Sequence, residues 1–468
     1  MSFRRAVFGR TLYLCVFTLF TLLYNFCYVS RVMNYAANGV LVFWGLILLA
    51  HDLRGKRRSA GHRLLMPFLG FLAVYVVAVL INARNGFFEN GYMFLLCVVE
   101  FFVLCAYDSS AEKDHVLREI KCVSLTAVAA SFPLSAGSLV LFAGKMKVMA
   151  YGNAYGFVHG RLYGFYTNPN SGSMVAFFSI ALSLVLMLIW KKRFRKLLIA
   201  NILVQFLYLA LALSRGSQAA LIVFALFFSF FLFMRKIRIK SVRLRIAAAL
   251  SAAVVSVGAL ALALEVSRLG LSYIPETVSY VEKVIVKEPT PGITPVPIER
   301  DYSKGFFSPR STIWRAGLAL FLKRPVFCVG PYSIAPMTEP YLPAKLHSHV
   351  RIGGLHNNYL QVLVSAGAAG LLAYMAILAV LNTVYIRYLI DCLRRRRLPF
   401  ALFGCMTGLS AALLIYNLVE SKIMLDNCMV SAMFWIFSGY ALYFCLKDKG
   451  EKAGQPQEPP DGEMGVRC

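Results

Sequence analysis

Charged residues are scarce in this 468-residue sequence, since only 15% of the positions are Asp, Glu, Lys or Arg. A water-soluble domain carries more charge on its surface, so this composition excludes a soluble protein or a hidden soluble catalytic domain. The mean hydropathy of +0.65 indicates an integral membrane protein instead. Apolar runs of about 15 to 22 residues recur along the chain, which is the length that a helix needs to cross the hydrocarbon core of a bilayer.

Acidic residues are also few, and they are scattered. There is no Asp-x-Asp pair, and the expected outer segments hold only isolated acids. Examples are Glu276, Glu282, Glu299, Asp301 and Glu339. A divalent cation that bridges a diphosphate to carboxylates needs a closer cluster. His347 and His349 lie near a third histidine, but their irregular loop spacing disfavours a zinc site. We therefore predict no metal and no other cofactor, so cationic side chains would neutralise any bound phosphate.

The eleven cysteines do not suggest a disulfide framework. Six of them fall inside apolar runs, and Cys328 is the only one in the long outer loop. The six are Cys15, Cys27, Cys97, Cys105, Cys405 and Cys445.

The apolar runs predict an all-α membrane protein of about twelve transmembrane helices. The expected spans are residues 11–30, 37–50, 64–82, 91–107, 120–142, 172–190, 197–213, 217–234, 246–264, 357–386, 400–418 and 428–446. The polytopic domain would cover residues 1–446, with the first span retained and not cleaved as a signal peptide. Residues 447–468, rich in charge and proline, predict a disordered cytoplasmic tail.

The formal charge of +27 reflects membrane orientation. Most Lys and Arg lie on alternate loops, which the positive-inside rule assigns to the cytoplasm. These basic groups occur within residues 4–10, 54–63, 113–121, 191–196, 235–245, 387–397 and 447–467. Both termini are then cytoplasmic, and residues 143–171, 214–216, 265–356 and 419–427 face outward. The charge implies contact with anionic membrane lipids, and we expect no nucleic-acid partner.

The long outer loop, residues 265–356, has two different halves. Its first half is interrupted by Pro289, Pro291, Pro295 and Pro297, which predicts an irregular flap over the membrane face. The second half predicts a helix over residues 309–323 that lies on the outer membrane interface. Ser308 would cap this helix, Pro309 would occupy its first position, and Pro325 would end it.

Two arginines next to the membrane indicate an anion site. Arg310 lies in the first turn of the helix predicted in the long loop, where a cation opposes the helix dipole unless an anion is held there too, and Trp314 shares its face. Arg215 lies in a very short turn between two spans, followed by Gly216, which permits close backbone approach. Both arginines could instead extend towards the interface as ordinary snorkelling side chains, but we favour binding of a phosphate-like anion.

His356 lies where the long loop re-enters the membrane, directly before Asn357. An interfacial histidine often serves only as a hydrogen-bonding group. Beside two arginines on the outer face, it is the natural general base, because it can accept a hydroxyl proton near neutral pH.

Weaker signals come from four further residues. Asn168 and Asn170 flank a proline at the start of the sixth span, where they either cap a helix or support a site together with Arg161 in the preceding loop. Glu100 lies within the fourth span, where an ionisable group indicates a polar interior or a structural hydrogen bond.

Taken together, these motifs resemble the O-antigen ligase and polymerase superfamily of bacterial envelope proteins. The matching motifs are the Asn-Pro-Asn stretch ending at Asn170, Ser214-Arg215-Gly216, Arg310 to Trp314 followed by Arg324-Pro325, and His356 with Gly367. The resemblance implies a multi-pass protein of the bacterial cytoplasmic (inner) membrane with its active site facing the periplasm. It also implies an undecaprenyl-diphosphate-linked glycan as donor, a glycan or lipid acceptor, and other polysaccharide-assembly proteins as possible partners.

The same resemblance assigns the roles of the three residues. Arg215 and Arg310 would hold the diphosphate, and His356 would serve the acceptor, so that the glycan moves by displacement at its anomeric carbon. A lipid core as acceptor would make the protein a ligase, and a carrier-linked chain would make it a polymerase.

Two other functions use a similar layout. A transporter or flippase of lipid-linked glycans would also need arginines for the diphosphate, but transporters bind substrate near the bilayer midplane. A cell-wall glycan polymerase of the shape-and-division type would depend on an acid in the outer loop, for which Asp301 is the test residue.

Overall fold

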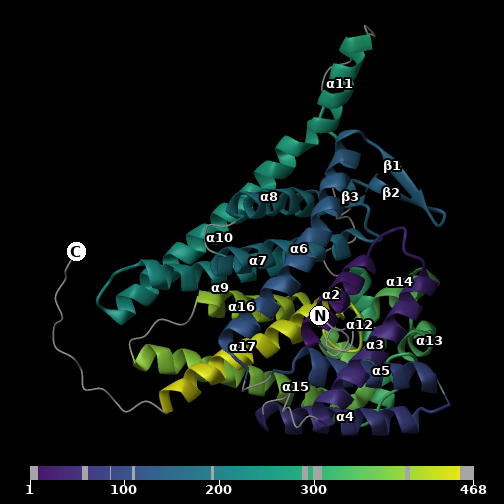
Figure 1. The fold of residues 1–468 in the computed structure, drawn as a ribbon. Coiled ribbons are helices and arrows are strands. Elements are labelled where there is room, and N and C mark those ends of the chain that lie inside the picture. Colours follow the sequence, from purple (N-terminus) through teal and green to yellow (C-terminus); the bar gives the residue numbers. More distant parts are fainter. Residues whose placement is uncertain are drawn as a thin grey trace, which may run out of the picture.

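The computed structural model describes residues 9–54, 62–84, 86–107, 111–190, 194–286, 294–298, 308–395 and 401–453. In this part of the chain, a large helical bundle carries a small sheet and a group of short helices at one end (Figure 1). The first half contains α2 (Arg10–Leu23), α3 (Arg31–Arg54), α4 (His62–Ile81), α5 (Phe87–Val99), the π-helical turn η1 (Glu100–Leu104), α6 (Lys113–Ala143), β1 (Lys147–Ala150), β2 (Asn153–Val158), β3 (Arg161–Gly164), α7 (Pro169–Trp190), α8 (Arg195–Ala212) and α9 (Arg215–Lys236). The second half contains α10 (Val242–Ser272), α11 (Ile274–Val286), α12 (Ser308–Lys323), α13 (Ile334–Thr338), η2 (Glu339–Tyr341), η3 (Ala344–Leu346), α14 (His347–Gly353), α15 (Asn358–Arg394), α16 (Ala401–Tyr416) and α17 (Met429–Ala453).

The helices agree with the spans expected from hydropathy. Ten helices in the described part are long and apolar enough to cross a membrane, and α2 and α16 are shorter apolar helices at the two remaining positions. A mostly helical, multi-pass membrane protein is therefore confirmed, while the number of crossings and the sidedness of the termini stay predictions. α17 continues through Ala453, and the rest of the expected tail, residues 454–468, lies outside the described residues.

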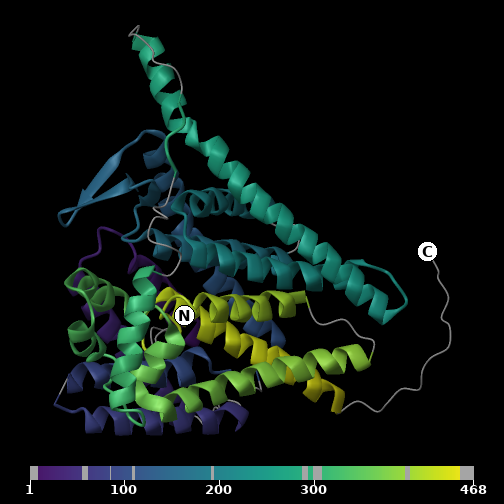
Figure 2. The same cartoon turned by 180° about the vertical axis from the view of Figure 1, so that it is seen from behind.

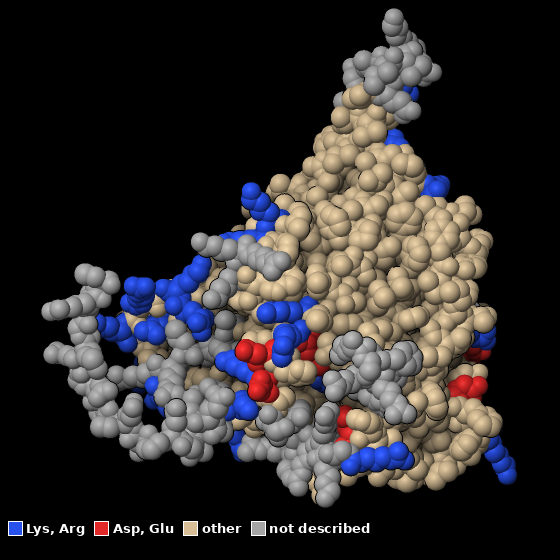
Figure 3. Space-filling model, viewed as in Figure 1, with Lys and Arg blue, Asp and Glu red and all other residues tan. Residues whose placement is uncertain are grey.

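The bundle has two distinct ends. Figures 1 and 2 show the sheet, α13 and α14 at one end, and the junction of α9 with α10 at the other. On the face seen in Figure 3, Lys and Arg gather around that junction. This distribution is the kind that the positive-inside rule describes, with the sheet and the short helices at the opposite end.

Segment 143–171, which we expected to face outward, contains a three-stranded antiparallel sheet in the order β1-β2-β3, which the helix-only expectation missed. The strands are only four to six residues long and a bulge interrupts β2 between Gly156 and Phe157, so no clear alternating pattern is visible in the sequence. Gly156 has φ 101°, and a Cβ there would lie 2.4 Å from the Met146 carbonyl oxygen. The close approach of the two strands thus depends on glycine.

The start of the long loop, residues 265–286, is mainly helical and not irregular as expected. α10 continues eight residues past the end of the predicted span, and α11 follows it and projects beyond the rest of the bundle (Figure 1). The only proline before residue 287 in this stretch is Pro275, which occupies the first turn of α11, where proline is tolerated. Pro289 and Pro291 lie outside the described residues. Residues 294–298, which include Pro295 and Pro297, have no regular structure.

The short helices α12 to α14, residues 308–353, form a cap with its own hydrophobic core against the start of α15. Ile313, Ala316 and Leu320 of α12 are at most 3% exposed and pack in this core with Leu355, whereas Leu322 is 75% exposed. α12 is therefore not simply an interfacial helix, because its apolar residues divide between a protein core and the outer surface.

α15 breaks at Gly367, which has φ 73° and ψ −172°. Segment 325–330 fills the break: its amides donate to the carbonyls of Val364 and Ser365 at 3.2 and 2.9 Å, and its first carbonyl accepts from the Ala368 amide at 2.8 Å. In an unbroken helix, the Ala368 amide would donate to the Val364 carbonyl. Backbone groups at membrane depth need such substitute partners, so the break and the cap are parts of one arrangement.

A buried polar network joins α6, α7 and α8. Ser131 donates to Ser179 at 2.8 Å, and Ser135 donates to Gln205 at 2.7 Å and lies 3.2 Å from the Tyr166 hydroxyl. All five residues are fully buried. Paired polar groups of this kind fix the register of helices in an apolar environment, and here they also fix the segment that leads into α7.

The loop between α16 and α17 contacts the N-terminal helices. The side-chain amide of Asn427 donates to the side-chain oxygen of Asn38 in α3 at 3.1 Å and to the Tyr92 hydroxyl of α5 at 3.2 Å. Residues near the two ends of the chain therefore meet inside the fold.

We predict that Gly367→Ala strongly destabilises the protein. A Cβ at residue 367 would lie 1.8 Å from the Val326 carbonyl oxygen, and the backbone conformation is one that only glycine adopts easily. Strain and overpacking together should cost about 2–4 kcal/mol. The measurement is the apparent unfolding temperature in detergent. Gly258→Ala in α10 is the control, since nothing lies within 4 Å of its Cβ. Equal unfolding temperatures for the two variants would contradict the prediction.

Candidate functional site

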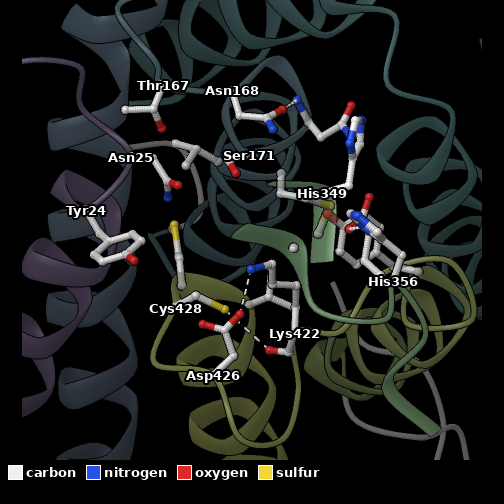
Figure 4. A pocket seen from close by; sticks show the side chains of 18 of the residues that line it. Tyr24, Asn25, Thr167, Asn168, Ser171, His349, His356, Lys422, Asp426 and Cys428 are labelled. Atoms are coloured by element: carbon white, nitrogen blue, oxygen red, sulfur yellow. Dashed lines mark hydrogen bonds and ion pairs between the residues drawn. The ribbon is translucent and has the colours of Figure 1, made fainter. Parts of the chain in front are cut away.

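A cavity of about 400 Å³ opens where four segments meet, at the end of the bundle that carries the sheet and the cap. Its lining residues come from segments 24–25, 167–175, 348–356 and 416–430. Of the residues selected from sequence, His356, Asn168 and Asn170 lie on its wall (Figure 4). The other candidates lie behind the wall or away from it.

Asn168 and Asn170 belong to the start of α7. The Asn168 side chain accepts from the Asn170 amide at 2.8 Å, and the Asn168 carbonyl accepts from the Gly172 amide at 3.0 Å. Helix capping therefore explains Asn168, and the cap also places both asparagines on the cavity wall.

Arg161 is a brace between β3, α7 and the turn before α9. Its guanidinium donates to the carbonyl of Ala212 at 2.9 Å and to the Asn170 side chain at 2.8 Å. Leu213 has φ 51°, so the chain reverses within two residues and α9 begins directly at Arg215. Arg161 does not line the cavity in the described structure, and its contacts indicate a positioning residue.

Arg215 is the first residue of α9 and stands next to the cavity wall without lining it. The next residue, Gly216, packs on Tyr416, because a Cβ at residue 216 would lie 3.0 Å from the Tyr416 ring, and that ring lines the cavity. Any larger residue at 216 would move the helix end away from Tyr416.

Glu420 joins His356 to Arg310. One carboxylate oxygen accepts from an Arg310 guanidinium nitrogen at 2.7 Å, and the other lies 3.0 Å from His356 Nδ1. Three segments far apart in sequence therefore meet at one carboxylate: the first turn of α12, the connection between α14 and α15, and the loop after α16. Two of the three predicted functional residues, one cation and the histidine, are brought together in this way.

The charge state of Glu420 follows from these contacts. Burial alone would favour the neutral acid, but the hydrogen bond from His356 and the positive charge of the Arg310 guanidinium outweigh it and hold the pKa of this carboxyl below its usual 4.5. Glu420 is 6% exposed and is a buried anion with two partners. Removal of one partner of such a buried ion pair destabilises the fold strongly, because the remaining charge is left uncompensated.

His356 is held in place by its neighbours on both sides. It has φ 50°, and Gly353 leaves room for its ring, because a Cβ at Gly353 would lie 2.4 Å from His356 Cε1. The Asn357 side chain caps α15 by accepting from the Leu360 amide at 3.0 Å. The Trp314 indole donates to the Leu355 carbonyl at 3.0 Å. Asn357 and Trp314 therefore position His356 and do not reach the cavity themselves.

Glu100 lies away from the cavity. It is 1% exposed within η1, and Ser431 of α17 donates to one of its oxygens, while the other oxygen has no partner within the described residues. The structure thus places Glu100 in the interior of the bundle and not beside His356.

No group of three His, Cys, Asp or Glu that could hold a metal ion occurs among the described residues. His349 lines the cavity, whereas His347 lies 3.1 Å from the Leu342 carbonyl within the cap. Asp301, the test residue for a shape-and-division polymerase, lies outside the described residues. The cysteines in the described part are all free.

Three charged residues of the site were missed by sequence reasoning. Glu420, Lys422 and Asp426 all lie in the segment between α16 and α17, and all three line the cavity. A signal was present, because three charges in a short connection between two apolar spans are unusual. Their partners are 64 and 110 residues away in the case of Glu420, which no local pattern reveals.

We predict that Glu420 contributes stability that depends on pH. Its folded-state pKa is lowered, so the contribution is present above the unfolded-state pKa and is lost as the pH falls through the lower folded-state value. Wild type should therefore unfold at a higher temperature than Glu420→Gln at about pH 7, and the difference should shrink towards about pH 4. Thermal unfolding in detergent across this range is the measurement. A difference that stays constant with pH would contradict the assignment.

Comparison with known families gives one match. Residues 200–375 match the family model described as O-Antigen ligase. The matched region contains Arg215, Arg310 and His356, whereas Asn168 and Glu420 lie outside it. None of the curated proteins that were compared matches the chain.

Proposed function

We propose that this protein is a membrane glycosyltransferase of the O-antigen ligase/polymerase superfamily, because residues 200–375 match the family model described as O-Antigen ligase. The donor is a glycan on an undecaprenyl diphosphate carrier, and the acceptor is a hydroxyl group on the outer face of the bacterial cytoplasmic membrane. The observation that carries the proposal is the contact of Glu420 with both His356 and Arg310 beside a cavity that can admit a sugar.

His356 acts as the general base in this proposal. When Nδ1 donates its proton to Glu420, Nε2 is unprotonated and can accept the proton of the acceptor hydroxyl. The acceptor oxygen then forms a bond to the anomeric carbon, and the bond from that carbon to the diphosphate oxygen breaks. Glu420 stabilises the imidazolium that results, so it is a positioning residue whose charge also supports the proton transfer.

Arg310 and Arg215 neutralise the leaving diphosphate. Glu420 occupies one guanidinium nitrogen of Arg310, which leaves the rest of the guanidinium group to donate to an anion. Arg215 lies at the N-terminus of α9, where the positive end of the helix dipole adds to its charge. The diphosphate takes the electron pair of the broken bond, so the reaction needs no nucleotide, and we expect it to proceed in the presence of a metal chelator.

The decisive test uses proteoliposomes that contain the purified protein and an undecaprenyl-diphosphate oligosaccharide. Wild type should produce a ladder of longer glycans if it is a polymerase, or transfer only to an added lipid acceptor if it is a ligase. His356→Ala should reduce transfer by about 10²- to 10⁴-fold, because it removes the proposed general base. His51→Ala is the control and should remain active. His51 lies near the C-terminal end of α3, whereas the cavity is lined by residues 24–25, which precede α3.

The outcomes of this test exclude one another. Full activity of His356→Ala would remove the histidine from the mechanism. Movement of the carrier across the bilayer without any glycosidic product would instead favour a transporter.

We predict that Arg310→Gln and Arg215→Gln each lower kcat by about 10²- to 10³-fold, because each removes a charge from the developing diphosphate anion. The measurement is the steady-state rate of carrier release at saturating donor. Arg351→Gln is the matched control, since Arg351 lies on the cap but pairs with Glu339 at the surface. Unchanged rates in the Arg310 and Arg215 variants would show that other groups hold the diphosphate.

A further inference from the structure

One wall of the cavity is not used by the mechanism above. Figure 4 shows Tyr24, Asn25 and Thr167 on the side opposite His349 and His356, with Lys422 and Asp426 below and between them. This set is called the polar wall here. Its residues come from the loop after α2, the segment before α7 and the loop after α16.

Backbone pairing brings the first two of these segments together. The Thr167 amide donates to the Asn25 carbonyl at 2.9 Å, and the Cys27 amide donates to the Phe165 carbonyl at 2.9 Å. The pairing is that of two short extended segments, with Phe26 opposite Tyr166. Asn25 and Thr167 therefore have fixed backbones, and their side chains reach the same cavity.

The polar wall has hydrogen-bonding capacity that the protein does not use. Within the described part of the chain, the side chains of Asn25 and Thr167 make no hydrogen bond, and neither does Ser171, which lines the cavity next to them. In folded proteins, polar groups turned towards a partly enclosed space usually meet a water or a ligand. These side chains offer donors and acceptors without net charge.

An ion pair completes the polar wall. Lys422 Nζ lies 2.5 Å from Asp426 Oδ2, and the two side chains are 25% and 29% exposed. Burial works against the charge of Lys422, but Asp426 outweighs it and raises the pKa of the ammonium, so Lys422 keeps its positive charge. Each ion uses only part of its capacity in this pair, because an ammonium has three donors and a carboxylate has four acceptor positions.

The combination favours an uncharged, polyhydroxylated ligand. A hydroxyl group both donates and accepts, so neighbouring hydroxyls of a sugar ring can bind an ammonium and a carboxylate side by side. The ion pair has no net charge, so this wall does not favour a phosphate group in addition to the donor diphosphate. Tyr24 adds an aromatic ring at the edge of the same wall.

We propose that the polar wall is the acceptor subsite, which binds the terminal neutral sugar of the acceptor glycan through its hydroxyl groups. This inference rests on the proposed glycosyl transfer. The polar wall faces His356 across the cavity (Figure 4), so a sugar that it holds can present a hydroxyl group to that histidine.

The test measures transfer kinetics with two separate substrates. The donor is the undecaprenyl-diphosphate oligosaccharide, and the acceptor probe is the same oligosaccharide released from the carrier and labelled with a fluorophore at its reducing end. Fluorescence anisotropy of the labelled probe with the purified full-length protein gives binding without turnover.

Two variants probe the polar wall from different segments. Asn25→Ala removes a side chain with no partner in the described structure, so a purely structural role predicts no effect. The double variant Lys422→Met with Asp426→Leu removes both charges together, which is generally tolerated better than the loss of one partner. The matched control is Arg395→Met with Asp391→Leu, an ion pair of the same spacing at the far end of α15.

We expect the acceptor KM to rise about 5-fold in Asn25→Ala and about 10- to 100-fold in the double variant. Probe binding should weaken in parallel, while the donor KM and the control variant stay within about 2-fold of wild type. An unchanged acceptor KM, or a rise in the donor KM instead, would overturn the acceptor subsite while leaving the transferase intact. No glycosidic product from wild type would overturn the proposed function and this inference together.

Discussion

The geometry of the site depends on the break in α15 at Gly367. Segment 325–330 enters this break and exchanges backbone hydrogen bonds with both halves of the helix. This contact anchors the cap to α15, and the cap in turn carries Arg310 at one end and leads into His356 at the other. A continuous helix would offer no open carbonyl to this segment, so the arginine and the histidine would not be held at a common distance from Glu420.

Glu420 links this backbone arrangement to the side chains of the proposed reaction. Its carboxylate stands between a cation and an imidazole, and each contact orients the side chain that it meets. The same group thus links the residue proposed to accept a proton to one proposed to hold the leaving group. Lys422 and Asp426 repeat the principle two and six residues later, where opposite charges lie side by side within the same cavity.

Hydropathy was sufficient to predict the long apolar helices, and the family match of residues 200–375 agrees with the resemblance inferred from the motifs. Long apolar runs leave few alternatives in a membrane, and the Asn-Pro-Asn motif located the start of α7. The sheet escaped prediction because its strands are too short for a clear pattern. The extent of α10 and α11 was not predicted, because the irregular structure expected from the prolines at residues 289–297 was extended over the whole first half of the loop.

The site was predictable only in part. Arg310 and His356 stood out because two arginines and a histidine occur together in the expected outer segments, and the structure brings Arg310 and His356 to the same carboxylate. Arg161, Asn357 and Trp314 turned out to brace the site, which depends on contacts with distant backbone carbonyls and amides. Glu420 could not be assigned a partner from sequence, because its contacts join residues brought together only by the folded bundle.

The contact between Asn427 and Asn38 has a consequence for how the protein is made. These residues are 389 positions apart, and the cavity draws its walls from segments that are equally distant, near residue 24 and near residue 426. During synthesis the early helices enter the membrane long before the last connection emerges from the ribosome. The cavity therefore does not exist in any partly inserted chain, and a ligand can meet the complete site only after insertion has ended.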